Sequence, residues 1–142
     1  MRALRDAPFT FRPMHNFRRL LVWQRAHAVV VEIERLVMRI PRRDNAELIS
    51  QLRRAAVSIP ANIVHGSGRA SDREFVRYLG IALASAAEVE YHLELAADTG
   101  RILRDEFELR KAELVEIRKM LVGLIRRMNS NGETPGPSMG RV

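Results

Sequence analysis

The stretch QLRRAAVSIPANIVHGSGR, residues 51–69, decides how this chain is expected to fold. Its leucine, alanines and isoleucines recur every three or four residues, which is the period of one helical face. Pro60 stands inside this pattern, although an interior proline costs a helix about 3 kcal/mol. The carbonyl of Ala56 loses its helical partner, and Ile59 is pushed away from helical geometry, because of the proline ring. We therefore predict a helix that is kinked at Pro60.

Two small polar residues flank the proline. Ser58 and Asn62 belong to residue types that bond to nearby backbone groups, so we expect them to satisfy the disturbed backbone and to lie mostly against other helices. The alternative is that the kink aims Asn62, His65 and Arg69 toward a ligand. We assign the structural motif of this segment to Gln51, Ser58, Pro60, Asn62 and Gly66.

Three further segments carry the helical period, which gives four predicted helices. They run from about 17 to 39, from near 44 to the glycines at 66 and 68, from 71 to 100, and from near 105 to 128. No long period-two alternation appears, and the connections are short, so we predict an all-α, antiparallel up-and-down four-helix bundle. The predicted core positions are Val22, Ala26, Val29, Ile33, Leu36, Ile40, Leu48, Leu52, Ala55, Ile59, Ile63, Phe75, Leu79, Ala82, Ala86, Val89, Leu93, Leu114, Ile117, Leu121, Leu124 and Met128.

Capping patterns support these boundaries. Asp44 is the expected N-cap of the second helix, with a glutamate three residues on. Ser71 begins the S-x-x-E capping box of the third helix, and Gly100 ends that helix. Asp105 lies near the start of the fourth helix, again with a glutamate three residues on.

Length and composition indicate one globular domain. The chain has 142 residues, of which 46% are apolar and 29% charged. It has no cysteine, which excludes disulfides and thiolate metal sites. No apolar run approaches a membrane span, and no signal-peptide pattern opens the chain, so we expect a soluble cytoplasmic protein. The predicted bundle covers 16–129, between a disordered or misannotated extension at 1–15 and a disordered tail at 130–142.

The residues offer little support for an enzyme or a cofactor. None of the four histidines completes the E-x-x-H motif of a di-iron bundle. Glu88 and His92 could bind a metal weakly, but a surface ion pair is the commoner role of such a pair. The segment at 66–68 lacks the lysine of a phosphate-binding loop. We therefore expect no catalytic residue, no metal and no cofactor.

Two surface features are left open by the sequence. Gly80, Ala84 and Ala87 form a line of small residues that suits either core packing or a neighbouring protomer. Arg53 and Arg54 point about 100° apart on a helix, so one could pair internally while the other faces solvent or a neighbouring subunit.

The charge favours an anionic partner. The net charge is +7, and only two of the 24 basic residues are lysine. Codon bias in a high-GC genome would also explain the excess of arginine, but the positive charge still attracts nucleic acid. We predict a non-enzymatic protein that binds structured nucleic acid, most readily RNA, and the alternative is a protein-interaction scaffold. The first candidates for phosphate contact are Arg42, Arg43, Arg53, Arg54 and Arg69, with Arg18 and Arg19 behind them.

Four quoted segments also resemble a known family. LVWQ at 21–24 followed by AH at 26–27, QLRRAAVSIPANI at 51–63, GSGR at 66–69 and EFVRYL at 74–79 resemble the S23-type four-helix proteins encoded in intervening sequences of bacterial 23S ribosomal RNA genes. The chain is also similar to the accessory proteins of diversity-generating retroelements, basic pentameric barrels that bind RNA and a reverse transcriptase. The resemblance implies a four-helix protomer and a homopentamer. It implies no established biochemical activity.

Two positions depart from the family pattern. His65 stands where the family usually has a glutamate, so any role of that acid is in doubt and a pH-sensitive cation takes its place. Leu83 stands where the helix-three motif usually has an arginine.

Overall fold

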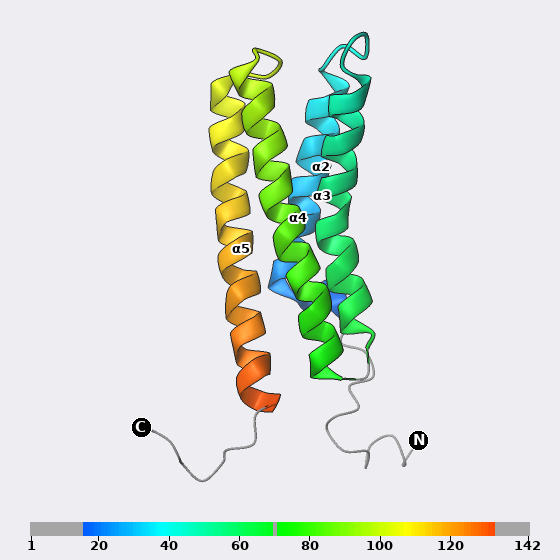
Figure 1. The fold of residues 1–142 in the computed structure, drawn as a ribbon, viewed down its shortest axis with the longest axis vertical. Coiled ribbons are helices and arrows are strands. Elements are labelled where there is room, and N and C mark those ends of the chain that lie inside the picture. Colours follow the sequence, from blue (N-terminus) through cyan, green and yellow to red (C-terminus); the bar gives the residue numbers. More distant parts are fainter. Residues whose placement is uncertain (1–15, 70, 133–142) are drawn as a thin grey trace.

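The structure, a computed structural model, describes residues 16–69 and 71–132 as an antiparallel helical bundle (Figure 1). A short 3-10 helix, η1 (Phe17–Arg19), leads into α2 (Leu21–Met38), which is followed by α3 (Ala46–Ser67), α4 (Asp72–Asp98) and α5 (Arg104–Gly132). The described residues contain no strand. The predicted all-α, up-and-down four-helix bundle is thus confirmed. The predicted tail begins too early, because residues 130–132 continue α5. The predicted extension at 1–15 and the rest of the tail, from 133, lie outside the described residues.

The helices follow one another around the bundle, and α5 closes it against α2. The α3–α4 pair packs most extensively and the α2–α5 pair least. This order brings the start of α2, the α3–α4 connection and the end of α5 together at one end, here called the terminal end (Figure 1). The α2–α3 and α4–α5 connections meet at the other end, here called the loop end.

The core is built from the positions that the periodicity predicts. All of them are buried except Leu48 and Leu124, which are partly exposed and still pack against the core. Trp23, Val30 and Val37 also contact the core, so α2 presents a broad apolar face to its neighbours. Burial of this continuous apolar surface is what stabilises a bundle of this size.

The two ends of α4 form as the sequence predicts. Ser71 Oγ accepts a hydrogen bond from the backbone N–H of Glu74 at 3.2 Å. At the other end Gly100 adopts φ 76°, and the backbone N–H of Arg101 donates to the carbonyl of Ala96 at 2.8 Å. This left-handed turn satisfies carbonyls that the helix end would leave free.

Two predicted helix starts are wrong. The first helix begins at Leu21, because the preceding turn is the 3-10 helix η1, capped by Asn16. Asp44 has φ 67° and does not cap α3; Asn45 takes the N-cap position, and its amide donates to the carbonyl of Pro41 at 2.8 Å. The fourth helix starts near Asp105 as predicted, because α5 begins at Arg104.

The segment around Pro60 remains helical. α3 runs without interruption through Pro60, and Ile59 is fully buried within it, so the expected displacement of Ile59 is wrong. The Asn62 amide donates to the Ser58 carbonyl at 2.7 Å and to Ser58 Oγ at 3.0 Å. The Ser58 and Ser85 hydroxyls hydrogen-bond at 2.8 Å. The polar pair is therefore part-buried and bonded as predicted, but it joins α3 to α4 and does not reach the Ala56 carbonyl.

Gly66 is predicted to end the second helix, but in the structure its role is to let two helices pack closely. It is buried inside the last turn of α3, and Gly68 is the C-cap. A Cβ atom at residue 66 would lie 2.6 Å from Phe75 Cδ1 and 2.9 Å from Tyr78 Cβ, both on α4. The two helices thus approach too closely for any side chain at this position. Gln51, also in the predicted motif, donates to Glu47 Oε2 at 2.8 Å on the same helix.

Candidate nucleic-acid interface

The fold distributes the five predicted phosphate contacts over the length of the bundle. Arg42 and Arg43 lie in the connection at the loop end, Arg53 and Arg54 lie on α3, and Arg69 follows α3 at the terminal end. All five side chains are exposed. They do not form one patch.

Three of them meet at a surface hollow of about 520 Å³, lined by Glu34, Arg42, Ala46, Ile49, Ser50, Arg53, Arg54 and Val57. Arg53 is already engaged there, since its guanidinium donates to both carboxylate oxygens of Glu34 at 2.8 and 3.0 Å. Those bonds raise the pKa of Arg53 above its ordinary value. Arg54 donates to Ser50 Oγ at 3.0 Å. The sequence left open which of these two arginines pairs within the protomer, and the structure shows that it is Arg53. Within the described residues the Arg42 side chain has no hydrogen bond or ion pair in this hollow.

The terminal end carries a stronger concentration of positive charge. Among the described residues, the helix ends that meet there carry seven exposed arginines and two carboxylates, those of Asp72 and Glu74. The seven are Arg18, Arg19, Arg69, Arg73, Arg77, Arg126 and Arg127. Because helix ends far apart in the sequence supply them, the density of charge is a property of the fold.

Charges at the loop end nearly cancel. Five arginines meet six carboxylates, and several are paired with one another: Arg39 with Glu106 at 3.3 Å, and Arg104 with Asp98 at 2.6 Å. The ten charged residues beside Arg39 are Arg42, Arg43, Arg101, Arg104, Asp44, Glu47, Asp98, Asp105, Glu106 and Glu108. Of the two ends, as far as the structure describes them, the terminal end is therefore the one with a net positive charge.

In the described part of the chain, four arginines of the terminal end make no side-chain hydrogen bond, ion pair or ring contact: Arg19, Arg73, Arg126 and Arg127. Arg18 differs from them only in that its guanidinium group lies over the Phe17 ring. The sequence-based candidates omitted the last three, although the predicted up-and-down order already places the end of the fourth helix beside the start of the third. Applying that order to the arginines would have found them.

Tyr78 organises a second group at the same end. The guanidinium groups of Arg69 and Arg77 lie 5.0 and 4.9 Å from its ring centroid, and Arg69 Nη2 donates to Tyr78 Oη at 3.2 Å. The exposed His65 ring stacks against Tyr78 with centroids 5.9 Å apart. His65 thus sits within an arginine cluster, where a protonated imidazole would add to the positive charge.

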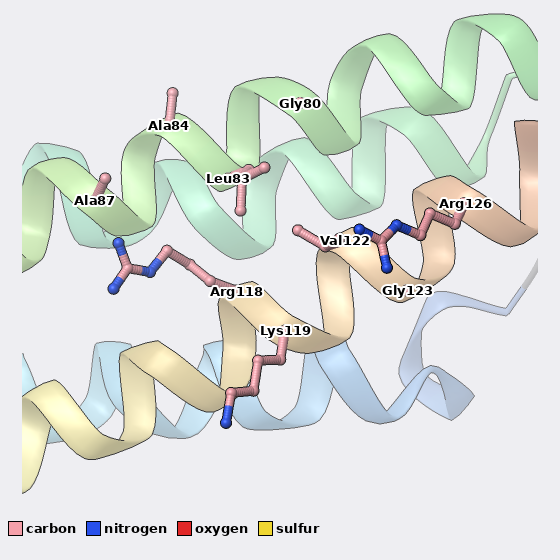
Figure 2. A pocket seen from close by; sticks show the side chains of 9 residues that line it. All are labelled: Gly80, Leu83, Ala84, Ala87, Arg118, Lys119, Val122, Gly123 and Arg126. Atoms are coloured by element: carbon pink, nitrogen blue, oxygen red, sulfur yellow. The ribbon is translucent and has the colours of Figure 1, made fainter.

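A groove of about 730 Å³ runs between α4 and α5 (Figure 2). Its lining is apolar and basic without a carboxylate: Gly80, Leu83, Ala84, Ala87, Arg118, Lys119, Val122, Gly123 and Arg126. The line of small residues on α4 is thus exposed, and the core-packing interpretation is wrong. A Cβ atom at Gly80 or Gly123 would meet nothing within 4 Å, so packing within the protomer requires neither glycine.

One arginine is buried between α2 and α5, nearer the loop end. Arg110 is 5% exposed and lies 2.9 Å from Glu113, 3.4 Å from Glu106 and 3.9 Å from Glu32. Arg110 Nε and Nη1 and Glu113 Oε1 make these contacts without a well-directed hydrogen bond. Burial raises the pKa of Glu113 against the effect of Arg110, and the charges of Glu32 and Glu106 raise it further.

Histidines and carboxylates of the described residues do not gather into a metal site. They contain no group of three or more histidines or carboxylates that could hold a metal ion. His92 and Glu88 form the expected pair at 3.3 Å on α4. A search of 16–69 and 71–132 for membrane-spanning helices finds none.

Comparison with known proteins agrees with this architecture. The model of the family described as "23S rRNA-intervening sequence protein" matches residues 18–123. A crystal structure of a protein with unknown function from the S23 ribosomal protein family of Bacteroides thetaiotaomicron is similar, with a TM-score of 0.68 and 30% identity. The likeness covers 75% of this chain and 99% of that one. No curated protein matches the chain.

Proposed function

Because the chain belongs to the 23S rRNA-intervening sequence protein family, we propose that it is a cytoplasmic, non-enzymatic protein that binds structured RNA through its terminal end. The observation that carries this proposal is the gathering of seven exposed arginines there, four of them without a partner. Arginine presents several donors in a planar fork that suits phosphate oxygens, and unpaired arginines bind without first breaking an ion pair.

The sequence-predicted candidates fit this proposal unequally. Arg69 belongs to the terminal end and remains a primary candidate. Arg42 and Arg43 are free but lie at the electrically balanced loop end, and Arg53 must leave Glu34 before it can bind phosphate. We assign a secondary role to Arg42 and Arg43 at the loop end and to Arg53 and Arg54 along the flank of the bundle.

Titration of labelled structured RNA over a salt series tests the proposal. We expect binding at about 50 mM salt and a linear fall of log K with log salt concentration, because bound cations release counterions from the phosphates. Absence of binding at that concentration would remove RNA as the ligand and favour the alternative, a scaffold for a protein partner. A pull-down that survives nuclease treatment would then support the scaffold.

Self-association is the second part of the proposal, and the family resemblance implies five copies. It is supported by the α4–α5 groove, whose Gly80 and Gly123 each cost about 1 kcal/mol of helix stability relative to alanine without an internal reason. Close approach of a neighbouring helix would supply the reason.

Charge along α5 suits contact between copies. The half of α5 near the loop end is net acidic: five carboxylates, those of Asp105, Glu106, Glu108, Glu113 and Glu116, outnumber the three cations Arg104, Arg110 and Lys111. The stretch of α5 that borders the middle of the groove carries Arg118 and Lys119, and no carboxylate lines the groove. A head-to-tail contact of unlike surfaces can close into a ring.

Light scattering tests whether the groove is the contact between copies. Gly80→Leu should yield smaller particles, whereas Ala112→Leu, at an exposed position elsewhere on α5, should not. Equal masses for the two variants would contradict the groove as the contact.

A further inference from the structure

A column of aromatic rings stands at the terminal end. Trp23, the one tryptophan of the chain, lies in the first turn of α2. The His27 ring stacks on it one turn further along, with centroids 4.9 Å apart and planes 7° from parallel. Phe17 of η1 meets the indole with centroids 5.0 Å apart and the planes at 66°. The guanidinium group of Arg18 lies 4.6 Å from the Phe17 ring centroid.

The inner part of the column is accounted for by the core, and the outer part is not. Trp23 is partly buried and packs against the core. His27 is exposed, and in the described part of the chain its ring makes no hydrogen bond or ion pair. Trp23 therefore contributes to the core, whereas His27 is an exposed ring whose one described contact is its stacking on Trp23.

A hydrogen bond between η1 and α2 supports the column of rings. The Gln24 side chain donates to the carbonyl of Arg18 at 2.7 Å, which ties η1 to α2. An ordered exposed ring loses little conformational freedom when a second ring stacks on it, and nucleobases stack on such rings in single-stranded complexes.

Cations for the adjoining phosphates are present. Leu20, Leu21 and Val22 share a hollow of about 420 Å³ with Lys119 and Arg127 of α5. The ring of Tyr78, at the same end, is less available for stacking with a base, because the guanidinium groups of Arg69 and Arg77 already lie within 5.0 Å of its centroid.

We propose that the exposed face of His27, supported by Trp23, stacks against an unpaired nucleobase of the bound RNA. This inference rests on the proposed function and names its ligand class: RNA that offers a single-stranded loop or segment at the terminal end. Bases inside a continuous duplex have both faces covered by their neighbours, so such a duplex can bind by its phosphates alone.

The single tryptophan makes the test direct. Trp23 emission is followed while the protein is titrated with an oligouridylate of about 12 nucleotides, and then with an RNA duplex of the same length. Anisotropy of an end label reports binding of either RNA independently. We expect the single strand to change the Trp23 emission in a saturable way, and the duplex to raise the anisotropy without that change.

Variants complete the test. His27→Ala should weaken binding of the single strand about tenfold and leave duplex binding unchanged, and His27→Phe should restore it. His65→Ala removes a ring from the same end outside the column, and it should have a much smaller effect. Anisotropy changes with no Trp23 response and no effect of His27→Ala would overturn the stacking inference and leave RNA binding intact. No anisotropy change with either RNA would overturn both proposals.

Discussion

The two ends of the bundle use charge in opposite ways. At the loop end Arg39, Arg104 and the buried Arg110 are held by carboxylates, and positive and negative groups nearly balance. At the terminal end most arginines face solvent, and carboxylates are few. The comparison distinguishes two roles of arginine that the amino-acid composition alone does not: some arginines hold helices together, and others remain free for a ligand.

Different forces also hold the two ends together. Near the loop end, ion pairs around Arg110 join α2 to α5, the least extensive helix contact of the bundle. Near the terminal end, Gly66 lets Phe75 and Tyr78 of α4 approach the backbone of α3. Stability at the terminal end thus depends on close apolar packing, so its arginines can be changed without unfolding the protein.

The largest expected effect is at Arg110. Arg110→Ala leaves three neighbouring carboxylates without their shared cation and opens a cavity, so we expect a loss of about 3 kcal/mol in the free energy of unfolding. Urea denaturation measures it. Arg104→Ala, which removes an exposed pair with Asp98, should cost much less, because solvent screens that pair. Equal losses for the two variants would contradict a structural role for the buried cluster.

Gly66→Ala gives the next effect, at the terminal end. The added methyl group would overlap Phe75 and Tyr78 and push α4 from α3, which should cost about 2 kcal/mol. Gly68→Ala is the matched control, because a Cβ there has no neighbour closer than 3.8 Å. Thermal melts that show the same change for both variants would refute the close-packing account.

Asn62→Ala should have a smaller effect, between the two ends. It removes the hydrogen bonds to the Ser58 carbonyl and hydroxyl, and we expect a loss of about 1 kcal/mol. The Ser58–Ser85 bond remains and limits the damage. A variant that is as stable as the parent but fails to bind RNA would instead make Asn62 a ligand contact.

The smallest expected effect is the pH response of Glu113. Its pKa is raised above 4.5, so the folded protein holds this proton more tightly than the unfolded chain. Its contribution to stability therefore falls as pH rises through and above that value. Relative to Glu113→Gln, the parent should lose less than about 1 kcal/mol between about pH 4 and 7. Denaturation curves of both proteins across that range give the difference, and a gain by the parent would have the wrong sign.

The sequence predicts the fold better than the interface, for identifiable reasons. Apolar periodicity locates the core residues, because burial depends on position around each helix. It cannot place Asn45 in the N-cap role that Asp44 seemed to fill, since both residue types cap helices and only the loop geometry decides. Arg53 and Arg126 look alike in sequence, yet one meets Glu34 across two helices and the other has no partner. The free arginines become visible only after the helix ends are brought together.

Paired variants at the two ends test the central claim most directly. Arg126 and Arg127 at the terminal end match Arg42 and Arg43 at the loop end, because each pair is adjacent, exposed and without a side-chain partner. Both residues of a pair are changed to glutamine, and the affinity for labelled RNA is measured over a salt series. We predict that the terminal-end variant loses affinity about tenfold or more and lowers the log–log salt slope by about 1.4. The loop-end variant should change little. An equal or greater loss from the loop-end variant would contradict the assignment of the interface to the terminal end.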